Sequence, residues 1–134
     1  MKKILLDTNF LLIPYQFKTD IFSEIDRISS YNYKIYVLDK SLDELNSIIQ
    51  KQKGKHREAA KIALQLLKLK KIEIIKTNSS KRTDDIIAEY AKEKEFIVGT
   101  QDKDLKRKLV NQGVTVIVLR QKKFLAIVND KGFE

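Results

Sequence analysis

Acidic residues stand beside short apolar segments at several places along the chain. They are Asp7 in "ILLDTNFLL", Glu44 in "SLDELNSI", Asp84 and Asp85 in "TDDIIA", and Asp102 and Asp104 in "TQDKDL". Carboxylate oxygens without histidine or cysteine are ligands that suit Mg²⁺ or Mn²⁺. Such ions activate water and stabilise the oxygens of a phosphate under attack. If the fold gathers these acids, the sequence predicts metal-dependent phosphodiester hydrolysis.

Helical spacing selects one acid from each neighbouring pair. Glu44 precedes an isoleucine by four residues, Asp84 precedes one by three, and Asp102 precedes a leucine by three. These three acids therefore border apolar helix faces, whereas the neighbouring acids align with polar or charged residues. The predicted catalytic and metal-binding set is Asp7, Glu44, Asp84 and Asp102. Asp104 is added as a metal ligand, and Asp104 or Asp85 would hold a second ion through water.

Each acid also has an ordinary structural explanation. Asp7 could form an Asx-turn, Thr83 could cap a helix ahead of Asp84, and Asp102 or Asp104 could cap the last helix. Glu44 could be a surface residue. Taken together these explanations are weaker, because four converging carboxylates repel one another and a divalent cation would relieve the repulsion.

Neutral polar residues accompany the acids. Thr8, Asn9 and Thr100 are predicted, with Asp85, to support the site by orienting the acids or the attacking water. Plain turn chemistry is the alternative for the three neutral residues.

Short Ile- and Val-rich runs alternate with amphipathic segments. Strands are expected at Lys3–Leu6, Lys34–Leu38, Ile72–Ile75, Glu95–Gly99 and Val114–Leu119. Helices are expected at Thr19–Ser29, Ser41–Gln50, Arg57–Leu69, Thr83–Lys94 and Asp102–Val110. This alternation predicts an α/β fold with a mostly parallel sheet, whose ligands bind beyond the carboxyl ends of the strands. The segment Lys122–Asn129 could be an edge strand or a partner-binding tail.

Composition sets the broad class of the protein. The 134 residues, 43% of them hydrophobic, predict a single domain over residues 1–134 with a sizeable core. No apolar run is long enough to span a membrane, and the start of the chain does not read as a signal peptide. Because there is no cysteine, disulfides and cysteine-based zinc sites are excluded. We expect a soluble cytoplasmic protein.

The net charge of +9 is concentrated in two stretches, Lys51–Lys71 and Lys103–Lys123. Basic clustering fits a polyanionic partner, since phosphates dominate the affinity of proteins for nucleic acids. A lysine-rich solvated surface is the alternative. The predicted RNA-binding residues are Lys53, Lys55, Arg57, Lys103, Lys106 and Arg107.

Other acidic α/β sites fit less well. A DxDxT phosphatase needs an aspartate where Asn9 stands, and the sequence contains no glycine-rich nucleotide-binding loop.

The four motifs, in this order and spacing, resemble those of PIN-domain nucleases over roughly residues 3–119. The family's D-T-[NS], E-L, D-x-x-[IL]-[AV] and T-x-D-x-D patterns are matched by "DTN", "EL", "DDIIA" and "TQDKD". The resemblance implies a three-layer α/β/α domain with a central, mostly parallel five-stranded sheet. It also implies an endoribonuclease that depends on Mg²⁺ or Mn²⁺ and cleaves RNA.

Two branches of the family compete. The doubled aspartate of "TDDIIAEYA" and the "DLKR" continuation look like the PIN nuclease of the small-subunit processome and its archaeal relatives, which favours rRNA processing. VapC-type toxins share the four motifs but usually have an aromatic residue where Leu105 stands. A non-catalytic ribosome-assembly factor that binds RNA is a third reading. A homodimer, an antitoxin partner and a pre-ribosomal particle are left open.

Overall fold

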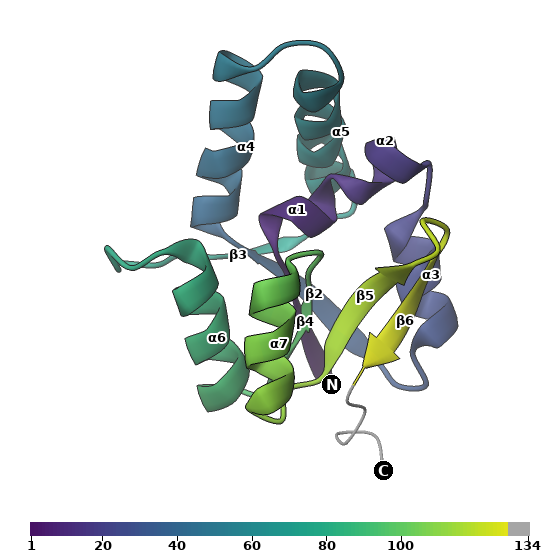
Figure 1. The fold of residues 1–134 in the computed structure, drawn as a ribbon, viewed down its shortest axis with the longest axis vertical. Coiled ribbons are helices and arrows are strands. Elements are labelled where there is room, and N and C mark those ends of the chain that lie inside the picture. Colours follow the sequence, from purple (N-terminus) through teal and green to yellow (C-terminus); the bar gives the residue numbers. More distant parts are fainter. Residues whose placement is uncertain (129–134) are drawn as a thin grey trace.

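The structure is a computed structural model and describes residues 1–128. Strands and helices alternate along this part of the chain, as the sequence predicts (Figure 1). The strands are β1 (Lys2–Leu6), β2 (Tyr33–Leu38), β3 (Glu73–Ile75), β4 (Phe96–Gly99), β5 (Val116–Arg120) and β6 (Phe124–Val128). The helices are α1 (Thr8–Leu11), α2 (Ile13–Phe17), α3 (Ile21–Ile28), α4 (Asp39–Lys51), α5 (Lys55–Leu69), α6 (Thr83–Glu93) and α7 (Lys103–Asn111).

One sheet runs through the molecule in the order β3-β2-β1-β4-β5-β6. The first five strands are parallel to their neighbours, and β6 pairs antiparallel with β5. The chain moves outward from β1 to β3 on one side and then crosses to β4 on the other side. The strand order therefore reverses between β1 and β4, which is where open α/β sheets place their ligands.

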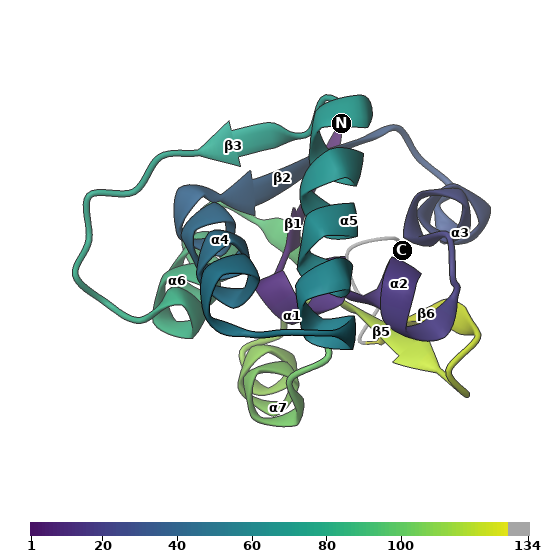
Figure 2. The same ribbon diagram turned by 90° about the horizontal axis from the view of Figure 1, so that it is seen from above.

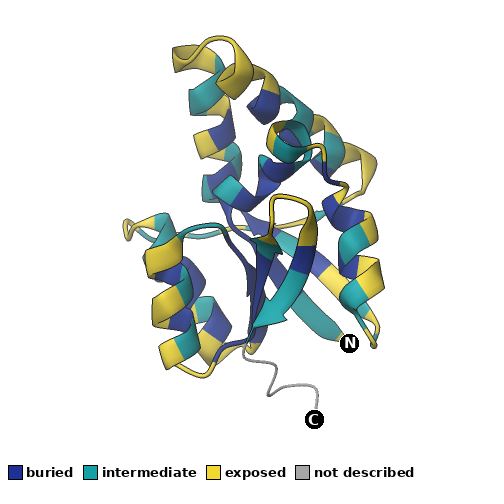
Figure 3. Cartoon of the chain, turned by 45° about the vertical axis from the view of Figure 1, so that its right-hand side comes forward, coloured by how far each residue is buried: buried dark blue, intermediate teal, exposed yellow. Residues whose placement is uncertain are grey.

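Helices cover both faces of the sheet (Figure 2). Ile4 and Leu6 of β1 face the larger core cluster, which includes residues of α1 to α5, while Leu5 faces the cluster formed with α6 and α7. This alternation follows from the two-residue period of a strand. Because all three side chains are buried, β1 is the centre of both cores, and the predicted three-layer α/β/α fold is confirmed (Figure 3).

The sheet has one strand more than the five expected. β6 answers the open question about Lys122–Asn129: the segment forms an antiparallel edge strand, with Asn129 outside the described residues. On the outer edge of β6, the Leu125 N–H donates to Glu24 Oε1 at 2.9 Å, and Arg27 Nη2 donates to the Leu125 carbonyl at 2.9 Å. These bonds from α3 occupy backbone groups that an edge strand would otherwise expose.

Two short helices, α1 and α2, were not expected. Asp7 caps α1, and Pro14 lies in the first turn of α2, where a missing N–H does no harm. α4 begins at Asp39, two residues before the expected start. No helix within residues 1–128 is long and apolar enough to cross a membrane.

Gly99 ends β4 where α1 crosses the sheet. A Cβ added there would lie 2.7 Å from Leu6 Cδ2 and 3.3 Å from two ring atoms of Phe10. Both neighbours are buried, so they have little room to move. Glycine is therefore needed at this position for the close approach of α1 to the sheet.

We predict that Gly99→Ala lowers the free energy of unfolding by about 1–3 kcal/mol, the usual cost of overpacking a core. Chemical denaturation of the four proteins in a cycle with Leu6→Val measures this. Leu6→Val should cost less in the Gly99→Ala background, because valine lacks the clashing methyl group. Unchanged stability of Gly99→Ala would contradict the packing described above.

Candidate active site

A pocket of about 700 Å³ opens beyond the carboxyl end of β1, and the residues after β4 border it. Its walls come from the ends of β1 and β4, from α4, and from the loop that leads into α6. The lining residues include all four acids of the predicted metal-binding set, namely Asp7, Glu44, Asp84 and Asp102. The pocket thus lies where the strand order reverses, as expected for a ligand site in this class of sheet.

Asp7 is the most deeply buried of these acids, with 9% of its surface exposed. Its Oδ1 accepts a hydrogen bond from the Thr8 N–H at 2.8 Å, and its Oδ2 accepts one from the Thr100 hydroxyl at 2.9 Å. Burial nevertheless raises the pKa of Asp7 from 3.8 to about 6, and the negative charges of Glu44 and Asp102 add to this rise. The two hydrogen bonds act in the opposite direction because they stabilise the ionised form.

Thr100 joins the two strand ends of the site. Its buried hydroxyl donates to Asp7 and accepts the backbone N–H of Asp102 at 3.0 Å. This one hydroxyl fixes the carboxylate after β1 relative to the loop after β4. The predicted supporting role of Thr100 thus has a concrete geometry.

Hydroxyl groups hold Glu44. Its Oε1 accepts from the Thr8 hydroxyl, and its Oε2 accepts from the Thr83 hydroxyl at 2.6 Å. Thr8 Oγ1 also lies 2.9 Å from the hydroxyl oxygen of Ser41, which is fully buried on the same face of α4. Thr83 is therefore not the helix cap considered above, since its hydroxyl is bonded to Glu44 and Arg82 occupies the cap position.

Asp102 and Asp84 complete the acidic rim. Asp102 caps α7, because its Oδ1 accepts from the backbone N–H groups of Asp104 at 2.9 Å and Leu105 at 3.1 Å. Asp102 thus caps the helix and also lines the pocket. Asp84 Oδ1 lies 3.6 Å from Arg82 Nε.

The other two acids do not line this pocket. Asp104 is 92% exposed and lies 3.5 Å from Arg107, and Asp85 lies 3.4 Å from Lys108. Asn9 does lie at the rim, where its side-chain oxygen accepts the N–H of Gln101 at 3.1 Å and so holds the loop after β4.

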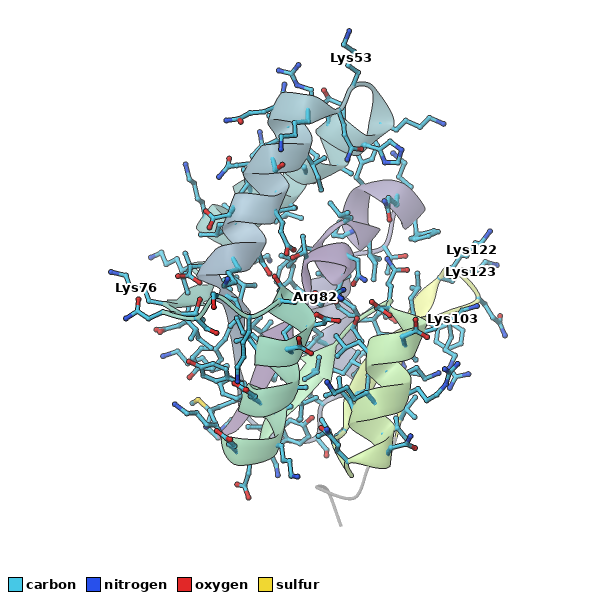
Figure 4. All side chains as sticks on the ribbon, turned by 60° about the vertical axis from the view of Figure 1, so that its left-hand side comes forward. Lys53, Lys76, Arg82, Lys103, Lys122 and Lys123 are labelled. Carbon is cyan, nitrogen blue, oxygen red and sulfur yellow. The ribbon has the colours of Figure 1, made fainter. Side chains whose placement is uncertain are left out.

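Basic residues that the sequence analysis did not select also line the pocket. They are Lys40, Lys81 and Arg82. The predicted RNA-binding residues lie elsewhere: Lys103 and Lys106 line a smaller hollow next to Thr100, and Lys53 stands at the far tip of the arm formed by α4 and α5 (Figure 4). Lys55 and Arg57 are exposed near that tip, and Arg107 is exposed on α7.

Sequence spacing held a signal for some of the missed residues. Ser41 stands three residues before Glu44 on the same helix face, and Thr83 directly precedes Asp84. Lys40 directly precedes Ser41, but nothing in its spacing marks it as a pocket residue.

The donor set suits a hard divalent cation. All four acids offer carboxylate oxygens as metal ligands. Burial is the main cause of the raised pKa of Asp7, and a cation would compensate the smaller contribution that the negative charges of Glu44 and Asp102 add to it. Within residues 1–128, no three acidic, histidine or cysteine side chains stand close enough to share an ion as they are oriented. The carboxylates are instead directed at hydroxyls, backbone N–H groups and Arg82.

A family described as a PIN-like domain matches residues 4–122 of the sequence. The chain belongs to the PIN-like domain family. This PIN-like domain is 35% identical to Ribonuclease VapC4 of Methanocaldococcus jannaschii, with 95% of this chain and 97% of that protein covered. The predicted resemblance to PIN-domain nucleases is confirmed, at the level of a PIN-domain ribonuclease.

Solved structures support the fold of this PIN-like domain. The PIN domain endonuclease Utp24 superposes with a TM-score of 0.77 at 22% identity, covering 95% of this chain and 91% of that chain. A chain of VapBC2 from Rickettsia felis, bound to a DNA fragment from its promoter, superposes with a TM-score of 0.63 at 17% identity. The match covers 88% of this chain and 99% of that chain.

The raised pKa of Asp7 predicts a pH dependence of stability in EDTA. Below pH 4 the carboxyl is protonated in folded and unfolded chains alike. Between about pH 4 and 6 the unfolded chain ionises first, so stability falls as the pH rises and then levels off. Asp7→Asn removes this fall. Its free energy of unfolding, relative to wild type, should therefore increase over that window by up to about 3 kcal/mol.

Chemical denaturation at a series of pH values measures the effect. Thr100→Val supplies the comparison. Loss of its hydroxyl should raise the pKa of Asp7 in the folded chain further, so the upper end of the window should extend to higher pH while the lower end stays in place. A difference between wild type and Asp7→Asn that stays constant from pH 4 to 7 would refute the assigned environment of Asp7.

Proposed function

We propose that this PIN-like domain is an Mg²⁺- or Mn²⁺-dependent endoribonuclease. The observation that carries the proposal is the convergence of Asp7, Glu44, Asp84 and Asp102 on one pocket at the reversal point of the sheet. The four acids arrive from different elements, so packing of the whole domain is needed to assemble them. A surface used only for binding a polyanion would gain nothing from this concentration of negative charge.

In this proposal Asp7, Glu44, Asp84 and Asp102 hold the ion or ions. When bound, the metal supplies water activation and charge neutralisation at the scissile phosphate. Thr100 and the Thr8 N–H keep the Asp7 carboxylate in one orientation, and the Thr8 and Thr83 hydroxyls do so for Glu44. Hydrogen bonds therefore fix the orientation of the Asp7 and Glu44 carboxylates individually.

RNA is the proposed substrate. The match to a ribonuclease over 95% of this chain supports it, and so do the net charge of +9 of the whole chain and the three basic residues that line the acidic pocket. Lys103 and Lys106, beside Thr100, would contact the strand near the site. Lys53, Lys55 and Arg57 would contact only RNA that extends along the arm formed by α4 and α5.

The extent of the match to VapC4 favours a VapC-type ribonuclease, with an antitoxin as the protein partner. The similarity to Utp24 is one of fold. Processing of rRNA, which the motif details favour, therefore becomes the second candidate. Homodimer formation, a pre-ribosomal particle as partner and a cytoplasmic location stay predictions from the sequence.

Adjacent acids provide matched tests of the catalytic assignment. Asp102→Asn and Asp84→Asn should each lower cleavage of RNA by at least about 100-fold, the scale of losing one electrostatic group at a reacting centre. Asp104→Asn and Asp85→Asn, which alter acids outside the pocket, should retain most of the activity. Initial rates with Mn²⁺, and their loss in excess EDTA, measure this. Equal effects within each pair, or full activity in EDTA, would refute the proposal.

The target class follows from the RNA ends that the enzyme produces. Sequencing of cellular RNA treated with wild type and with Asp7→Asn, both with Mn²⁺, identifies the cuts that depend on the site. A VapC-type enzyme should cut transfer or messenger RNAs. Its expression should then arrest growth, and co-expression of an antitoxin should suppress that arrest. Cuts confined to one position in ribosomal RNA would instead establish the processing role.

A further inference from the structure

The loop between β3 and α6, residues 76–82, borders the acidic pocket and carries three basic residues. Lys81 and Arg82 line the pocket directly, and Lys76 stands at the start of the loop (Figure 4). The loop has no helix or strand of its own, so its position depends on bonds to its neighbours.

Asp39 supplies most of those bonds from the first turn of α4. Its Oδ2 accepts the Thr77 N–H at 3.0 Å, and its Oδ1 accepts the Thr77 hydroxyl at 2.7 Å. The same carboxylate accepts the Lys40 N–H at 2.8 Å. These bonds lower the pKa of Asp39, so the carboxylate is ionised wherever the protein is folded near neutral pH.

A second bond closes the other end of the loop. Lys40 Nζ donates to the Lys81 carbonyl at 3.2 Å, which brings a third cation to the pocket wall. Lys81 forms an ion pair with Glu89, and Arg82 lies 3.6 Å from Asp84. Both side chains remain open to solvent, since Lys81 is 56% exposed and Arg82 is 84% exposed.

We propose that Lys40, Lys81 and Arg82 form a binding site for the phosphate backbone of the RNA strand, and that Asp39 is the residue that positions it. The three cations stand on the same pocket as the four acids, so a strand held by them lies beside the proposed metal site. Lys81 and Arg82 are carried by the loop, so their positions depend on how the loop is held. Asp39 and Lys40 bind the loop to α4. This inference rests on the proposed ribonuclease function.

Salt dependence of RNA binding tests the inference without relying on cleavage. In an Asp7→Asn background at one fixed Mg²⁺ concentration, fluorescence anisotropy of a labelled oligouridylate gives the Kd at increasing KCl. Lys81→Gln with Arg82→Gln should weaken binding several-fold. It should also reduce the slope of log K against log salt by about 1.4, since each phosphate contact of a single strand contributes about 0.7. Lys92→Gln, an exposed lysine of α6 that does not line the pocket, is the matched control and should change neither value.

A mutant cycle tests the positioning role of Asp39. Asp39→Asn keeps the shape of the side chain but replaces one acceptor oxygen with an NH2 group, so the Thr77 N–H and the Lys40 N–H can no longer both be accepted by this side chain. It should raise the Kd in the background with all three cations. It should raise the Kd by less than about twofold when Lys40, Lys81 and Arg82 are already glutamine, because nothing is left to position. An equal loss in both backgrounds would show a merely structural role and overturn the assignment.

The outcomes separate this inference from the proposed function. Unchanged salt slopes for Lys81→Gln with Arg82→Gln, in a protein whose wild type cleaves RNA, would overturn only the backbone site. Reduced slopes in a protein whose wild type does not cleave RNA would overturn only the ribonuclease proposal.

Discussion

The burial of the Asp7 carboxylate is the constraint around which the rest of the structure is arranged. A charge at the end of β1, where the last three strand residues are buried, is costly, and the raised pKa of Asp7 expresses that cost. The cost is kept within bounds because two donors meet the carboxylate, the Thr8 N–H that opens α1 and the hydroxyl of Thr100 after β4. The Thr100 hydroxyl reaches Asp7 because β1 and β4 are neighbours, so the strand order and the ionisable group are parts of one arrangement.

The same logic extends from Asp7 to the other acids. Neutral hydroxyl groups donate hydrogen bonds to Glu44, and neutral backbone N–H groups donate to Asp102. Among the basic side chains of residues 1–128, only Arg82 lies within ion-pair distance of a pocket acid. Neutral donors orient a carboxylate without cancelling its charge. The pocket therefore keeps a concentration of negative charge that favours a divalent cation, and the fold tolerates it through hydrogen bonds rather than through buried ion pairs.

Periodicity predicted the parts of the molecule that are long and regular. Strand positions and the four pocket acids followed from apolar runs and helix phase, because burial on a face leaves a repeating mark in the sequence. β6 was left undecided because its turn places Gln121 and Lys122 at positive φ without the glycine or asparagine that usually signals such a hairpin. α1 and α2 are too short to show a helical period. The hydroxyl bonds of Thr83 and Ser41 depend on how α4 and α6 pack, which spacing within one helix does not encode.

Basic charge shows most clearly how sequence and space differ. Clusters of basic residues along the chain favour Lys53, Lys55 and Arg57 as RNA-binding residues. Lys53, however, stands at the tip of the arm formed by α4 and α5 (Figure 4), Lys55 and Arg57 lie in the first turn of α5, and none of the three lines the acidic pocket. The cations on the pocket wall come from two separate segments, Lys40 from α4 and Lys81 with Arg82 from the loop before α6. They meet because β2 and β3 are adjacent and parallel, so the residues after each strand emerge at the same edge. Topology thus places positive charge beside the acids where no local run of basic residues predicts it.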